Sequence, residues 1–246
     1  MLDYFFFDIS NASKVESPFL WLLSLEPASY PHGVLVFMFF FVLSLTQLFI
    51  YLQHEEGVIE ERAHDYNANW MSAVEILDGD IYLGAENNIN LFTVRKNSEG
   101  AIDEERGRLE VLGEYHLGEF VIRFRHGSFV MHLPDYDGGQ IPTVIFEVGN
   151  GVIGVIALFP RDQYLFLEKL QSNLRKLIKG VGGLSHEQWR SFNNEKKTVD
   201  AKNLLDGDLI KTFLDLSHSR MEEIGKTMNT IVEELYERVE ELVGLH

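Results

Sequence analysis

The sequence of 246 residues has no cysteine, only six prolines, and far fewer basic than acidic side chains. Without cysteine there is no disulfide framework, no thiolate metal site and no thiol nucleophile, which fits a reducing compartment such as the nucleus or cytoplasm. The nine histidines never show metal-ligand spacing such as HExxH. No serine nucleophile motif or phosphate-loop signature is present. The sequence therefore predicts a protein that is not an enzyme and holds no metal or cofactor.

The deficit of basic side chains is concentrated in one part of the chain. The formal net charge is −17, and residues 54–160 alone contribute −12. A surface this acidic repels phosphate backbones, so direct binding of nucleic acid by this region is disfavoured. The charge points to protein partners instead.

Residues 1–53 form a hydrophobic N-terminal segment that differs in composition from the rest of the chain. Within it, residues 34–52 read VLVFMFFFVLSLTQLFIYL, which is uncharged and long enough to span a membrane as a helix. The same residue types are good strand formers, so a buried pair of strands is an alternative. A third interpretation is an N-terminus that is non-native or alternatively spliced. A membrane location depends on the first interpretation.

Residues 54–160 read as short strands separated by turns. Glycine marks several of the turns, and the Asp78-Gly79 step between two apolar runs is a hairpin signal. The expected strands cover residues 70–77, 81–85, 89–94, 109–117, 120–124, 128–133, 143–148 and 152–158. Many short strands at this spacing predict a barrel, a sandwich or a propeller, and periodicity alone does not choose among them.

After Pro160 the apolar residues follow a helical period. A first helix is expected to end before the glycines at 180–183. Ser185 to Gln188 form a capping box for a short helix that carries Trp189 and Phe192. Asp206 or Asp208 can cap the next helix. One long helix is expected from Ser219 to Leu242, with Ile231 among its buried residues. Residues 161–246 are thus predicted to form a small helical domain.

Several ungapped runs carry a resemblance to a known family. The longest is HEEGVIEERAHDYNANWMSAVEILDGDIYLGAENNINLF, His54 to Phe92. Four more runs are GEYHLGEF, FRHGS, GGLSHEQWRSFNNEK and LDGDLI, and the likeness ends at VEEL, Val239 to Leu242. These runs resemble the C-terminal part of the damaged-DNA-binding protein 1 family in its land-plant form. That family lies within a superfamily with the cleavage/polyadenylation specificity factor A subunit and a splicing factor 3B subunit.

The resemblance implies the fold class and the function. The fold is expected to be mainly β with α, a partial β-propeller of the seven-bladed type over residues 54–160 and a small helical C-terminal domain. The function it implies is that of a non-enzymatic adaptor that holds WD40-type substrate receptors for a cullin-4 RING ubiquitin ligase, linked to DNA repair. Because a separate propeller binds cullin-4 in the family, no direct cullin-4 contact is expected. A scaffold for RNA processing and a single-pass membrane protein remain alternatives.

The resemblance also implies which residues bind partners. The predicted partner-binding residues are His64, Tyr66, Asn69, Trp70, Ile122 and Arg123, and of these Trp70 matches the family tryptophan near the receptor cleft. For Trp70, a place in the propeller core is an equal alternative.

Three departures from the family pattern affect this prediction. His64 stands where ERARDYNANW has an arginine, and Ile122 replaces the asparagine of FVNRF. Phe146 to Gly151 replace FGTVNG, which shifts a glycine and adds a charge at an expected turn. Weaker receptor binding than in the family is therefore predicted.

Overall fold

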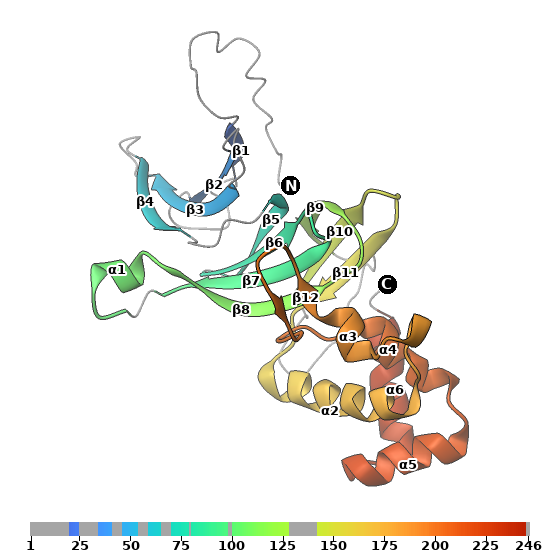
Figure 1. Ribbon diagram of the computed structural model, residues 1–246. Helices are drawn as coiled ribbons and strands as arrows, with labels where there is room; N and C mark the ends of the chain where they lie inside the picture. The colour runs from blue at the N-terminus through green and yellow to red at the C-terminus, as the bar shows by residue number, and fades with distance from the viewer. Residues whose placement is uncertain are drawn as a thin grey trace. The chain divides into compact units, whose positions relative to one another are not determined.

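Short antiparallel strands succeed one another along the first part of the chain, and helices dominate after residue 160 (Figure 1). The computed structural model describes residues 20–24, 34–40, 46–53, 59–64, 70–78, 80–97, 100–127 and 142–244. The chain divides into two units, Met1–Leu112 and Gly113–His246. The domain boundaries expected at 53/54 and 160/161 stay predictions.

Two four-stranded sheets share one simple topology. Their strands lie side by side in chain order, as in a meander. The first sheet holds β1 (Leu20–Ser24), β2 (Val34–Phe40), β3 (Thr46–Gln53) and β4 (Ile59–His64). The second holds β5 (Met71–Asp78), β6 (Ile81–Glu86), β7 (Asn90–Lys96) and β8 (Leu109–His116), with the short helix α1 (Asp103–Arg106) before β8. The blades of β-propellers are four-stranded sheets of this kind.

The hydrophobic segment 34–52 forms two strands. β2 and β3 pair antiparallel, with Val34 opposite Leu52 and Phe40 opposite Thr46. The membrane-helix interpretation is therefore wrong, and a strand pair forms, because β-branched and aromatic residues suit a pleated strand. The interpretation of a non-native or alternatively spliced N-terminus stays a prediction. None of the helices in the described ranges is both long and apolar enough to cross a membrane.

The second sheet buries side chains on both of its faces. Five consecutive residues of β6 and five of β7 are buried, among them Leu83 and Val94 at 0% exposure. In an antiparallel sheet with one solvent-exposed face, buried and exposed residues would alternate along each strand. Burial on both faces is what a propeller blade packed between neighbours requires.

The third sheet has the order β11-β10-β9 and lies in the second unit. Its strands are β9 (Val121–His126), β10 (Thr143–Val148) and β11 (Ile153–Ala157). Gly154 stands opposite Phe146, and a Cβ atom on Gly154 would lie 2.2 Å from Cζ of that ring. The second sheet has the same arrangement, with Gly84 opposite Phe92 and the phenylalanine ring lying where a Cβ atom would be. In both sheets a phenylalanine ring covers a strand glycine, so no larger residue fits there.

Replacing Gly154 with alanine is expected to lower the free energy of unfolding by about 1–3 kcal/mol, because the added methyl group overlaps the Phe146 ring. Gly207→Ala is the matched control. A Cβ at Gly207 meets no atom within 4 Å, so this variant is expected to gain about 0.5 kcal/mol. Urea denaturation of both variants checks the prediction, and equal effects would contradict it.

Five helices of the second unit surround one apolar core: α2 (Arg161–Leu177), α4 (Gly207–Lys211), η3 (Thr212–Asp215), α5 (His218–Met228) and α6 (Val232–Val243). The short helices η2 (Val181–Gly183) and α3 (His186–Arg190) contribute no residue to this core. The short strands β12 (Phe192–Asn193) and β13 (Thr198–Val199) pair between α3 and α4. At the centre of the core lie Leu170, Leu174, Phe213, Leu235 and Val239, each 0% exposed. Figure 1 shows α2, α4, α5 and α6 gathered around this centre.

Two helix predictions are corrected. The long helix expected from Ser219 to Leu242 is broken into α5 and α6, because Asn229 takes the left-handed conformation (φ 58°) and caps α5. Thr230 N then donates to Gly225 O at 3.0 Å, which closes the helix end. As a result Ile231, expected to be buried, is 66% exposed. Phe192, expected in the short helix, begins β12 instead.

Most other predicted elements are confirmed. Ser185 and Gln188 form the expected capping box of α3, and Asp206 caps α4. Seven of the expected strands match β5 to β11 within one or two residues. The strand expected over 128–133 lies outside the described residues. Antiparallel sheets followed by a small helical part confirm the predicted fold class, mainly β with α, an incomplete propeller with a helical C-terminal part.

Candidate protein-interaction surface

Trp70 lies directly before β5 in the first unit, and 51% of it is exposed. Its backbone is fixed, since Asn87 N donates to Trp70 O at 2.7 Å. A tryptophan that filled the propeller core would be buried. The exposed indole instead offers a large apolar face on an anchored backbone, which suits a contact with a partner protein.

Ile122 is exposed because β9 contains a bulge. In the pairing of β9 with β10, Val121 stands opposite Val148 and Arg123 opposite Glu147, which leaves Ile122 as the extra residue. Bulges interrupt a ladder and re-aim side chains, and they are common beside functional sites. Here the bulge leaves the isoleucine side chain 50% exposed.

Three further exposed apolar residues lie at the same end of this sheet. β9 and β11 both run antiparallel to β10, so both begin where β10 ends. Phe120 precedes β9 and is 40% exposed, while Val152 and Ile153, where β11 begins, are 57% and 53% exposed. We call Phe120, Ile122, Val152 and Ile153 the β9 patch. Exposed large apolar residues that share one end of a sheet are candidates for an interaction surface.

The turn between β10 and β11 is held against the start of β9. Gly149 N donates to Phe120 O at 2.9 Å, and Asn150 Nδ2 donates to Glu119 Oε2 at 3.0 Å. Gly151 has φ +87°, a conformation that glycine adopts without strain. The turn that carries Val152 is therefore fixed before any partner binds.

The added charge of Glu147 lies in a strand, which corrects the expectation that it falls at a turn. Glu147 belongs to β10 and stands directly opposite the half-buried Arg123. Opposite charges at facing positions of an antiparallel pair stabilise it modestly. Arg123 therefore has an acidic cross-strand neighbour within this chain.

The loop that carries Phe120 is anchored by α3. Arg190 Nη1 donates to Leu117 O at 2.9 Å and to His116 O at 3.3 Å. Trp189 stands edge-on to the His116 ring at 5.2 Å, and its Cζ2 lies 3.0 Å from where a Cβ of Gly118 would be. Only glycine fits at this position, where φ is +86°. The contacts fix the backbone on the approach to the β9 patch.

Arg190 is in turn held by a buried polar cluster. Arg190 Nε donates to Asp206 Oδ2 at 2.7 Å, and His186 Nε2 bonds the same oxygen at 2.8 Å. The other oxygen, Oδ1, caps α4 by accepting from Leu209 N at 3.1 Å, and Asp206 N donates to Gln171 Oε1 at 2.6 Å. We call His186, Arg190, Asp206 and Gln171 the Asp206 cluster. It joins α2, α3 and α4 to the loop before β9.

The electrostatics of the cluster favour the ionised carboxylate. Burial raises the pKa of Asp206, but the hydrogen bond from His186 and the charge and hydrogen bond of Arg190 outweigh it and hold that pKa well below its usual range. Burial and then the Arg190 charge lower the pKa of His116. Burial, together with the charge of Asp206, raises the pKa of Tyr115, whose ring lies 5.1 Å from the Arg190 guanidinium.

The predicted partner-binding residues fall into three groups. Trp70, Ile122 and Arg123 are described, with Trp70 in one unit and the other two in the second. His64 ends β4, and Tyr66 and Asn69 lie outside the described residues. Over the ranges that the structure covers, no His, Asp and Glu side chains converge as a metal site requires. The arrangement can bind a partner by apolar contact.

Phe120, Val152 and Ile153 were not predicted from the sequence as partner-binding residues. Each reads as an ordinary strand residue, and only the bulge and the shared end of three strands bring them together. Phe120 lies in the run GEYHLGEF, and the Asn150-Gly151 turn before Val152 was the one local signal available.

Comparisons with known proteins bear on this surface. Residues 44–215 match the family described as the CPSF A subunit region. The chain is 81% identical over 194 residues to DNA damage-binding protein 1 of Solanum lycopersicum and 77% identical over 194 residues to DNA damage-binding protein 1a of Arabidopsis thaliana. It is 71% identical over 194 residues to DNA damage-binding protein 1 of Oryza sativa subsp. japonica. Each alignment covers 79% of this chain and 18% of the relative, so the chain spans less than a fifth of the length of these relatives.

Proposed function

The chain belongs to the family of the CPSF A subunit region, and from this membership we propose that it is a non-enzymatic adaptor that binds partner proteins through the β9 patch of the second unit. The observation that carries the proposal is the β9 patch itself, with four apolar side chains 40–57% exposed on a backbone fixed by α3 and by the β10–β11 turn. A fixed apolar surface binds without a large cost of ordering.

We propose WD40-type substrate receptors as the partners, within a ubiquitin ligase pathway linked to DNA repair in the nucleus. The named relatives support this choice over a scaffold for RNA processing, because the 71–81% identical proteins are DNA damage-binding proteins. The net charge of −17 supports a protein partner over direct contact with DNA. Direct contact with cullin-4 is not expected, because the family places that contact on another propeller.

Affinity purification of the tagged chain from cells tests this function. The proposal expects WD40-type receptors to be recovered and cullin-4 to be absent. Recovery of RNA-processing factors in place of receptors would support the alternative scaffold. Recovery of chaperones alone would contradict the proposal, because it would mean that the surface does not form. A Phe120→Asp variant, purified in parallel, separates receptors held by the patch from background.

A further inference from the structure

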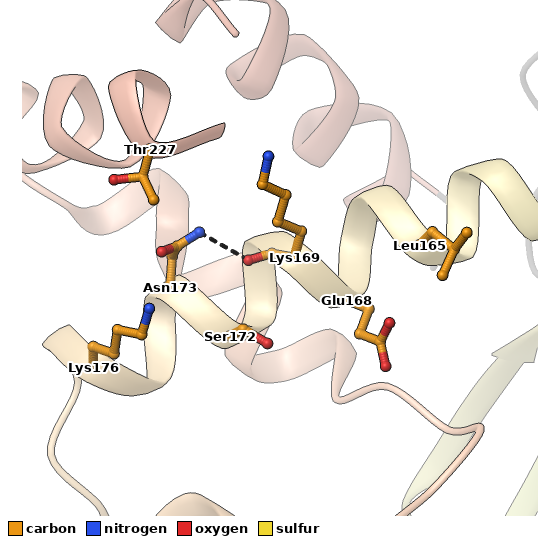
Figure 2. A pocket seen from close by; sticks show the side chains of 7 residues that line it. All are labelled: Leu165, Glu168, Lys169, Ser172, Asn173, Lys176 and Thr227. Carbon is orange, nitrogen blue, oxygen red and sulfur yellow. Dashed lines mark hydrogen bonds between the residues drawn. The ribbon is translucent and has the colours of Figure 1, made fainter. Parts of the chain in front are cut away.

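A shallow groove of about 280 Å³ runs along α2 in the helical part of the second unit. It shares no residue with the β9 patch. Leu165, Glu168, Lys169, Ser172, Asn173 and Lys176 line it from α2, and Thr227 lines it from α5 (Figure 2). These α2 residues recur at three- and four-residue steps, so they form one stripe on the helix. We propose that this groove binds an extended acidic peptide segment of a partner protein.

Two lysines give the groove its charge. Lys169 and Lys176 are seven residues apart, which places them on one face of α2 with about 10 Å between them along the axis. In Figure 2 Lys169 points toward the side of Thr227 and Lys176 extends toward Asn173, whereas Glu168 points the other way. Lys169 Nζ donates to Met228 O at 3.3 Å, and an ammonium group has two more donors to offer. In a chain of net charge −17 this is a local basic site.

The other lining residues favour a peptide over a small anion. Ser172 lies between the lysines and is exposed, so its hydroxyl is available to a polar group of a bound backbone in mid-groove. Asn173 is fixed by its own hydrogen bond, Nδ2 to Lys169 O at 2.9 Å. Leu165, 48% exposed, offers an apolar contact at one end that a phosphate ion would not use.

The spacing of the lysines fits acidic residues three positions apart. A polyproline II segment rises about 3.1 Å per residue and turns once in three residues, so such residues share a side about 9 Å apart. Disordered acidic segments sample this conformation readily. A single carboxylate can pair with only one of the two lysines, whereas two carboxylates three positions apart can pair with both.

Fluorescence anisotropy with the full chain tests the proposal. The probe is a fluorescein-labelled peptide of about ten residues with two glutamates three positions apart and a leucine at each end. A second peptide has the same composition with the glutamates adjacent. We expect tighter binding of the spaced peptide, affinity that falls as salt rises, and at least about tenfold weaker binding to Lys169→Glu/Lys176→Glu.

Two further variants test whether a loss of peptide binding is specific to the groove. Lys176→Glu alone keeps the Lys169 hydrogen bond to α5 and must still weaken binding. Lys211→Glu makes the same charge change on α4, outside the groove, and must leave binding unchanged. The proposal is overturned if the two peptides bind equally, if Lys211→Glu weakens binding as much, or if a labelled oligothymidine binds more tightly than the spaced peptide.

Discussion

Replacing Asp206 with alanine is expected to lower the free energy of unfolding by about 3–5 kcal/mol. The substitution leaves Arg190, whose side chain is 13% exposed, without its carboxylate partner at 2.7 Å, and an uncompensated charge that is largely removed from water is strongly destabilising. It also removes the cap of α4, which adds about 1 kcal/mol. Since small domains are stable by only about 5–15 kcal/mol, the helical part is expected to be largely destabilised. Urea denaturation followed by circular dichroism measures the loss.

Arg95→Ala is the matched control for this prediction. Arg95 pairs with Glu110 at 3.2 Å, but both side chains are about half exposed, so its loss is expected to cost less than about 1 kcal/mol. A smaller loss than Asp206→Ala is also expected for the apolar double replacement Arg190→Met/Asp206→Leu, because no buried charge remains. Equal losses for the buried and the exposed pair would contradict the assigned role.

Lowering the pH is expected to remove the stabilisation that the ionised Asp206 carboxylate provides. The folded-state pKa of Asp206 lies below its unfolded value, which is about 3.9. Its contribution is therefore complete above the unfolded pKa and is lost as the pH falls toward the folded one. Between pH 7 and pH 3 the wild-type chain should lose more stability than the Asp206→Asn variant does.

Placing a charge in the β9 patch is expected to weaken binding of a WD40-type receptor about 30- to 1,000-fold. Phe120→Asp and Ile122→Asp each replace an exposed apolar contact with a carboxylate that would be desolvated on binding. Truncation of a hot-spot residue at the centre of an interface costs about 2–4 kcal/mol, which corresponds to this range. Biolayer interferometry with a purified receptor measures the change.

Ile231→Asp tests whether the effect is local. Ile231 is 66% exposed between α5 and α6, so this substitution adds the same charge to an exposed isoleucine outside the patch. It is expected to leave receptor binding within about twofold of wild type. A loss equal to that of Ile122→Asp would mean that the β9 patch is not the interface.

The sequence predicted much of the fold because local signals and tertiary structure agree. The strands of the second sheet, the Ser185 cap and the Asp206 cap all lie where turn residues and periodicity predicted them. Segment 34–52 was ambiguous because its residues suit both a membrane helix and a strand. Pairing of β2 with β3 decides between them, and no local signal carries that pairing. The break at Asn229 was readable in principle, since asparagine is a common left-handed cap.

The candidate site was harder to predict than the fold. Ile122 and Trp70 were singled out by resemblance, and exposure of 50% and 51% is consistent with a contact role. The bulge that exposes Ile122 depends on the register of β9 against β10, which the sequence does not encode locally. The anchoring of Leu117 by Arg190 joins residues 73 positions apart and could not be predicted from spacing.

Hydrogen–deuterium exchange with and without a purified WD40-type receptor tests the proposed interface most directly. We expect slower exchange on receptor addition over residues 119–123 and 149–154, with little change in α5 and α6. Unchanged exchange in both of these segments, alongside protection elsewhere, would contradict the assignment of the β9 patch as the partner-binding surface.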